Sequence, residues 1–129
     1  MLIDDGTGGL TYKVIGIAIG IHKRYGPGLL EKAYLRPFVE ELRAAGHAVE
    51  CQPSLSIEHG DVIIENAFRA DVIVDRRLVI EVKSVAVLLD VHKQQLSTYM
   101  RLAGIHAGLL INFNVPVLRH GIRRVVLPE

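Results

Sequence analysis

The chain has 129 residues, of which 50% are hydrophobic and 22% charged, and its formal net charge is +1. These values predict one domain with an ordinary core and exclude a strongly electrostatic polyanion binder, so any polyanion site must be a local patch. The single cysteine excludes an internal disulfide and a cysteine-based zinc site. Because no apolar run approaches about 18 residues and no signal-peptide pattern opens the chain, we expect a cytoplasmic protein with no membrane segment.

The first part of the chain predicts two helices. Residues 1–9 are rich in Gly and Asp and are expected to be a flexible lead-in to a single domain over residues 10–129. A helix over 12–24, capped by Thr11, is apolar nearly all round, which predicts burial on several sides.

A glycine- and proline-containing break precedes a second helix over 29–45, whose apolar residues recur at helical spacing. Pro37 lies inside it and is expected to kink or split the helix, because proline removes a backbone hydrogen bond.

The remaining chain predicts strands separated by one further helix. The strands are expected at 48–58, 62–74, 78–83, 106–113 and 118–127.

The further helix is expected over 86–103, ended by Gly104. Its core-facing residues are predicted to be Val87, Leu88, Val91, Leu96 and Leu102. The resulting order of two helices, three meander strands, a crossover helix and return strands predicts a mixed α/β sandwich with helices on a small sheet.

Two acidic residues are expected to face each other in the hairpin between the second and third strands. A three-residue loop at 75–77 would pair Val74 with Leu78. Counting back along both strands then places Asp71 directly opposite Glu81, with Cβ atoms about 5 Å apart. Two such carboxylates in an apolar hairpin repel each other and lose hydration, and a divalent cation with oxygen ligands would compensate both effects.

Lys83 shares the face of Glu81 because strand side chains alternate, and the same count places Arg69 opposite Lys83. In a nuclease, paired carboxylates hold Mg²⁺ and a nearby lysine positions the attacking water or neutralises developing negative charge. The alternative interpretation is a surface Asp71 with an ordinary Glu–Lys pair on an exposed strand face.

Three further residues are candidates for the same site. Glu31, in the first turn of the second helix, could add an outer carboxylate, or could be a solvated glutamate favoured by the helix dipole. Gln95 and Tyr99 lie four residues apart on one helix face and could hydrogen-bond a phosphate or a metal-bound water. Their alternative is a polar helix face with a half-buried tyrosine.

Several separated motifs together resemble the GxxExxY proteins, a family placed in the PD-(D/E)XK, restriction-endonuclease-like nuclease superfamily. The similarity extends over about residues 10–126. The matching motifs are Gly28-Leu29-Leu30-Glu31-Lys32-Ala33-Tyr34, Arg69-Ala70-Asp71, Glu81-Val82-Lys83, Gln95-Leu96-Ser97-Thr98-Tyr99 and Gly108-Leu109-Leu110-Ile111-Asn112-Phe113.

This resemblance implies a restriction-endonuclease-like αβββαβ core. It also implies a Mg²⁺ (or Mn²⁺) site made by Asp71, Glu81 and the backbone carbonyl of Val82, with Glu31 as an added acid. Lys83 would be the catalytic lysine, and Gln95 and Tyr99 match a helix motif of exonuclease-like branches. Ala70 stands where the superfamily pattern has proline, and Pro37 could displace Glu31.

The first functional hypothesis is a Mg²⁺-dependent nuclease acting on DNA or RNA. The alternatives are a catalytically silent module that binds nucleic acid or a protein partner, and a small-molecule hydrolase with the same metal site. A homodimer is possible, since exposed strand edges and the arginines at 119, 123 and 124 could serve a dimer or a phosphate backbone equally.

Overall fold

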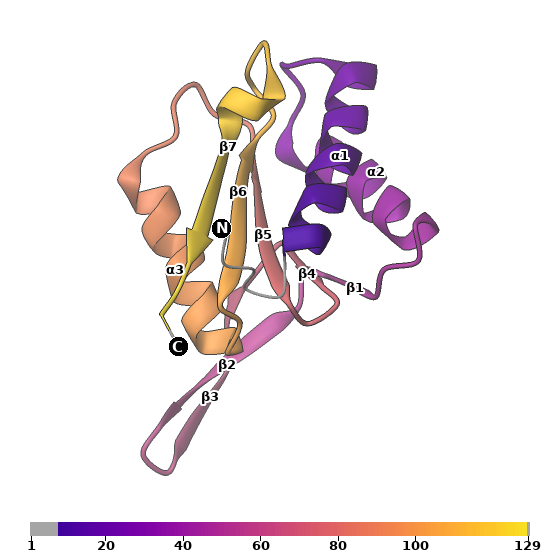
Figure 1. Ribbon diagram of the computed structural model, residues 1–129. Coiled ribbons are helices and arrows are strands. Elements are labelled where there is room, and N and C mark those ends of the chain that lie inside the picture. The colour runs from indigo at the N-terminus through magenta and orange to yellow at the C-terminus, as the bar shows by residue number, and fades with distance from the viewer. Residues whose placement is uncertain (1–7, 129) are drawn as a thin grey trace.

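Helices cover both faces of a five-stranded sheet in the computed structural model, which describes residues 8–128 (Figure 1). Helices α1 and α2 lie on one face and α3 on the other. The elements are α1 (Gly8–Tyr25), α2 (Glu31–Ala44), β1 (Val49–Cys51), β2 (Ser54–His59), β3 (Val62–Arg69), β4 (Val72–Val74), β5 (Leu78–Lys83), α3 (Asp90–Ala103), β6 (Ala107–Asn112), the 3-10 turn η1 (Leu118–Gly121) and β7 (Ile122–Val126).

The main sheet has the strand order β1-β4-β5-β6-β7. Strands β5 and β6 pair in parallel, with α3 as the crossover between them, and the other neighbours are antiparallel. The expected mixed α+β sheet flanked by helices, of restriction-endonuclease-like type, is confirmed. No helix among residues 8–128 is both long and apolar enough to span a bilayer.

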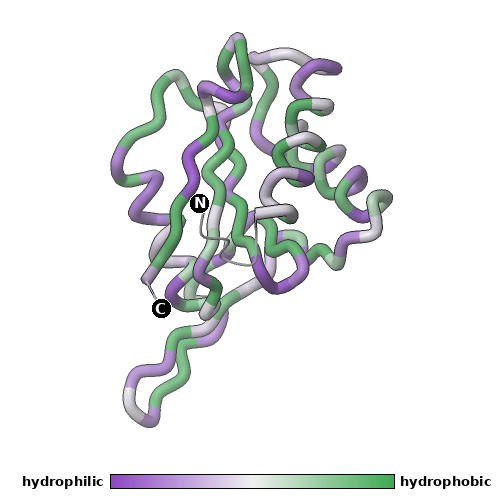
Figure 2. The backbone as a smooth tube through the Cα atoms, viewed as in Figure 1, coloured by the Kyte–Doolittle hydropathy of each residue, from purple (hydrophilic) through white to green (hydrophobic). Residues whose placement is uncertain are grey.

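The sheet separates two apolar clusters. Val72, Ile80 and Val82 pack toward α1 and α2, whereas Ile73 and Val79 pack toward α3. A strand buried on both faces needs apolar residues at nearly every position. This requirement explains the continuous apolar runs of the central strands, visible as green tube in Figure 2, and makes a charged residue on β5 conspicuous.

Three of the predicted strands are wrong in extent. The strand expected at 118–127 begins only at Ile122, after the turn η1, and the other two each divide between two sheets. The expected strand 48–58 becomes β1 and β2, separated at Gln52, whose φ is 49°, and Pro53. The expected strand 62–74 becomes β3 and β4. Strands β2 and β3 form a separate two-stranded sheet that projects from the body (Figure 1).

Because of this division Arg69 pairs with Ser54, so its predicted position opposite Lys83 is wrong. A single side-chain pattern cannot indicate which sheet a strand joins, since the backbone can bond equally well with either set of neighbours.

The helices also differ from expectation at their ends. Helix α1 begins at Gly8, so Thr11 is a buried residue within the helix and not its cap. Residues 1–7 of the lead-in predicted over residues 1–9 lie outside the part of the chain that the structure describes. Helix α2 continues through Pro37 without being split.

The predicted core face of α3 is largely wrong. The helix begins at Asp90, so the segment before it is a loop, and Val87, Val91 and Leu102 are exposed. Leu96 is buried as predicted, and Met100, one turn later, completes the buried face. The helix therefore turns a narrower apolar stripe to the sheet than a pattern starting at residue 86 suggested.

Candidate metal centre

A tight turn fixes the register of β4 and β5. The N–H of Arg77 donates to the carbonyl of Val74 at 3.0 Å, and both central residues, Asp75 and Arg76, have φ near +53° to +54°. Two left-handed central residues define the type I′ geometry that matches the twist of a hairpin. Arg77 follows these two residues as the third residue of the loop, and Val74 pairs with Leu78, as predicted.

The carboxylate of Asp75 holds this turn in place. It accepts hydrogen bonds from the backbone N–H of Ala48 at 2.8 Å and binds His47 Nδ1 at 2.9 Å. An aspartate tolerates left-handed φ better than most residues and here is fixed by two partners.

Asp71 and Glu81 meet across the hairpin through reciprocal hydrogen bonds. The N–H of Asp71 donates to Glu81 Oε1 at 3.0 Å, and the N–H of Val82 donates to Asp71 Oδ2 at 2.8 Å. Both acids share the face of Ile73 and Val79, which packs toward α3. The predicted juxtaposition of the two acids is therefore confirmed, and the alternative of a solvent-exposed pair is wrong because Glu81 is only 3% exposed.

Burial disfavours the charged form of both acids. Burial, and then the negative charge of Asp71, raise the pKa of Glu81 to about 8. Burial also raises the pKa of Asp71, although the N–H of Val82 and the ammonium of Lys83 oppose the increase. A cation placed between the two groups would reverse this preference by favouring both ionised forms.

Lys83 and Gln95 join β5 to α3 beside the acid pair. Lys83 Nζ lies 4.0 Å from Glu81 Oε2 and donates to Gln95 Oε1 at 3.1 Å. The glutamine thus keeps the ammonium at the edge of the acid pair rather than in full contact with one carboxylate.

Tyr99 stands one turn further along α3. Burial, and then the charge of Glu81, raise the pKa of its phenol. Its ring stacks on Phe68 of β3, with centroids 4.9 Å apart. The structure therefore brings six of the predicted site residues together: Asp71, Glu81, Val82, Lys83, Gln95 and Tyr99.

Glu31 is not part of this cluster. It is exposed in the first turn of α2, and within residues 8–128 no three His, Cys, Asp or Glu side chains gather closely enough to hold a metal ion.

The neighbouring Tyr34 has a structural role instead. Its hydroxyl donates to the carbonyl of Gly26 at 2.5 Å and accepts from the N–H of Leu29 at 3.1 Å, and its ring stacks on Phe113 at 4.6 Å. Ser84 Oγ donates to the Leu29 carbonyl at 2.6 Å, so this loop is attached to the end of β5.

Two supporting residues were missed by the sequence reasoning. Asn112 is 2% exposed and clamps Val85: its Oδ1 accepts from the Val85 N–H at 3.0 Å and its Nδ2 donates to the Val85 carbonyl at 2.9 Å. The clamp fixes the chain as it leaves Lys83. Phe68 is the second, through its stack on Tyr99. A polar residue at the end of an apolar strand was the available signal for Asn112.

The fold and the site together define a class of protein: a helix-flanked mixed sheet that carries paired acids and a lysine on adjacent strands, as metal-dependent nucleases do. The family model of the PD-(D/E)XK nuclease superfamily matches residues 9–125, and the chain belongs to this superfamily. No curated protein sequence matches the chain.

Among solved structures, the chain is similar to the crystal structure of SSO0001, with 21% sequence identity and a TM-score of 0.51. The similarity covers 93% of this chain and 62% of that chain, so the present chain spans less than two thirds of that protein's length. At this identity the likeness supports the fold alone.

PD-(D/E)XK nucleases generally use divalent metal ions, and the two carboxylates at this centre are donors of the kind that such ions prefer. Mg²⁺ and Mn²⁺ favour carboxylate and carbonyl oxygens, and Asp71 and Glu81 supply two carboxylates held side by side by backbone hydrogen bonds.

Proposed function

We propose that this protein is a divalent-metal-dependent phosphodiesterase that cleaves DNA or RNA. The single observation that carries the proposal is the Asp71–Glu81 pair on the α3 side of the sheet, with Asp71 half-buried, Glu81 buried and the ammonium of Lys83 4.0 Å from Glu81. A buried acid pair destabilises a fold when it has no counter-charge, so its presence points to a binding role.

Each residue has a proposed part in the reaction. Asp71, Glu81 and the carbonyl of Val82 would hold Mg²⁺ or Mn²⁺, which when bound lowers the pKa of water and offsets phosphate charge. Lys83, steadied by Gln95, would neutralise negative charge developing on the phosphate. The Tyr99 hydroxyl would donate a hydrogen bond to the substrate.

Glu31 is proposed only as an outer acid that interacts with the site through water, because it does not join the cluster of the other site residues.

A basic groove beside the site supports a polyanionic substrate. A cavity of about 350 Å³ runs between α2 and the end of β1, where Lys32, Arg36 and Arg43 line it together with Glu40. Gln52 also lines this groove, and its N–H donates to the carbonyl of Asp71 at 2.7 Å. The groove therefore ends beside the backbone of Asp71 on the α2 side of the sheet, whereas the two carboxylates face α3, and its cations could bind phosphates of a substrate that passes this edge.

Cleavage of labelled single- and double-stranded DNA and RNA in Mg²⁺ or Mn²⁺ tests this function. Lys83→Ala and Asp71→Asn should each reduce cleavage by at least about a hundredfold, since both remove groups at the reacting phosphate. Lys93→Ala, at an exposed α3 lysine, is the matched control and should cleave like wild type. Equal residual cleavage by wild type and Lys83→Ala would assign the activity to a contaminant and refute the proposal.

A second candidate function is a nuclease-fold module that binds nucleic acid without cutting it. The observation in its favour is that no third acid joins the pair within residues 8–128. Calorimetric titration with Mn²⁺ separates the two candidates. Binding that Asp71→Asn abolishes supports the enzyme, whereas no binding, or binding that Asp71→Asn leaves unchanged, supports the module.

A further inference from the structure

The two-stranded sheet of β2 and β3, called here the arm (residues 54–69), leaves apolar side chains uncovered. Val62, Ile63 and Ile64 are 59%, 62% and 46% exposed. Figure 2 shows the arm projecting from the body, with a green, hydrophobic stretch next to a hydrophilic tip. Contiguous exposed apolar residues on a projecting element are typical of an interaction surface.

One face of the arm is covered near the body and uncovered beyond it. At the base, Leu55 pairs with Phe68 and both contact the α3 side, Leu55 in the apolar cluster and Phe68 against Tyr99. Further out, Ile57 pairs with Ile64, and directly opposed residues point the same way. The apolar face of the arm therefore continues beyond the part that packs against the α3 side of the body.

The arm is also too slight to be stable alone. A two-stranded hairpin is marginal in water, and both of its outer edges present unpaired backbone groups. Strand β3 has 8 residues and extends about 27 Å at about 3.4 Å per residue, long enough to reach across a neighbouring molecule.

The negative charge on the far half of the arm favours a basic partner surface. Glu58, Asp61 and Glu65 give its far half an acidic character that would repel a phosphate backbone, so nucleic acid is a poor occupant. A protein surface with an apolar floor and basic rim is the complementary partner.

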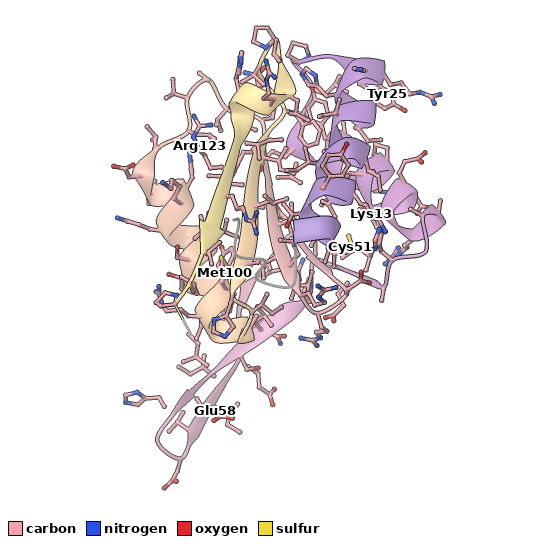
Figure 3. All side chains as sticks on the ribbon, in the orientation of Figure 1. Lys13, Tyr25, Cys51, Glu58, Met100 and Arg123 are labelled. Carbon is pink, nitrogen blue, oxygen red and sulfur yellow. The ribbon has the colours of Figure 1, made fainter. Side chains whose placement is uncertain are left out.

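Such a surface exists on the same chain. A cavity of about 250 Å³ has Met100, Ile105 and Leu127 as its apolar floor, with Arg101 and His106 at its rim. We call this the α3 groove. It adjoins the base of the arm, because Leu55 packs in the cluster that contains Met100 and Ile105. Figure 3 labels Glu58 on the arm and Met100 in the body, and the two residues lie well apart within one copy.

We propose that the protein forms a two-fold dimer in which the arm of each copy lies in the α3 groove of the other. Within one copy the arm points away from the α3 groove that adjoins its base. A two-fold axis that places one copy's arm in the partner's α3 groove also places the partner's arm in the first copy's α3 groove. Two identical contacts then close the assembly and leave no arm free. This inference is independent of the proposed nuclease activity.

Sedimentation and light scattering over a range of concentrations test the dimer. Wild type should be dimeric at micromolar concentration. Val62→Thr/Ile64→Thr keeps β-branched side chains and so preserves the arm, but it should weaken dimerisation at least about tenfold. Tyr12→Thr, at an 81% exposed apolar residue of α1, is the matched control and should dimerise like wild type.

Charge reversal tests which surfaces meet. Glu58→Lys and Arg101→Glu should each weaken the dimer, while an equimolar mixture of the two variants should recover dimers, because the lysine arm then meets the glutamate groove. Recovery in a mixture cannot arise within one chain. A protein that stays monomeric, a dimer insensitive to these changes, or an arm variant that loses only nucleic-acid affinity would each overturn the proposal.

Discussion

Replacing Glu81 by glutamine should stabilise the metal-free protein, most strongly at high pH. The pKa of Glu81 is about 8 in the folded chain, against an ordinary 4.5. Because the folded pKa is the higher one, the folded state keeps a proton that the unfolded state releases. The stability associated with this group is therefore fully present below about pH 4.5 and is lost as the pH rises toward about 8.

The size of the effect follows from the same values. Each pKa unit corresponds to about 1.4 kcal/mol, so wild type without metal should lose about 3 kcal/mol of unfolding free energy between about pH 5 and about pH 7. Glutamine carries no charge, and its Oε1 can still accept the hydrogen bond from the Asp71 N–H. Glu81→Gln should therefore lose much less stability over this range.

Urea unfolding in EDTA at several pH values measures the difference. Glu41→Gln, at an exposed glutamate of α2, is the control and should follow the wild-type pH dependence. Adding Mg²⁺ should raise the stability of wild type at about pH 8 and leave Glu81→Gln nearly unchanged, because the metal site then lacks one carboxylate. Parallel pH profiles for wild type and Glu81→Gln in EDTA would refute the reasoning that burial holds a proton on Glu81.

Three further predictions concern the basic groove between α2 and β1, the Asn112 clamp and the glycine at position 121. Lys32→Gln/Arg36→Gln should weaken nucleic-acid binding in Ca²⁺, measured by fluorescence anisotropy, and lower the magnitude of the salt slope by about 1.5; an unchanged slope would exclude the groove from the substrate path. Asn112→Ala should cost about 2–3 kcal/mol in urea unfolding by leaving the Val85 backbone unpaired, and a loss below about 0.5 kcal/mol would contradict the clamp. Gly121→Ala should destabilise markedly, since a Cβ would lie 2.3 Å from the Asn112 carbonyl oxygen. Gly16→Ala has open space in a helix and should instead be neutral or stabilising by up to about 1 kcal/mol in thermal unfolding.

The acid pair could be predicted from the sequence because it depends on local rules. Strand alternation and one loop length are enough to set Asp71 opposite Glu81, and both conditions are satisfied within a hairpin of adjacent strands. The position of Lys83 follows from the same alternation. Gln95 and Tyr99 needed one more condition, namely that α3 crosses back over the sheet face that carries the acids.

Other parts of the site depended on contacts between distant segments. Glu31 belongs to a recognisable motif, yet its exposure at the start of α2 follows from how the loop before it is fastened by Tyr34 and Ser84. The clamp between Asn112 and Val85 joins β6 to the loop after β5; the local pattern marks Asn112 as a polar residue ending an apolar strand but does not indicate its partner.

The sequence by itself determined the helices, the apolar runs and the facing acids, because these arise from periodicity and hairpin geometry over a few residues. Only the tertiary structure decided that the runs 48–58 and 62–74 divide between two sheets, so that an arm leaves the body. The physical reason is that strand residues bond equally well to any suitable edge. The choice depends on which edges and apolar surfaces the folded chain makes available.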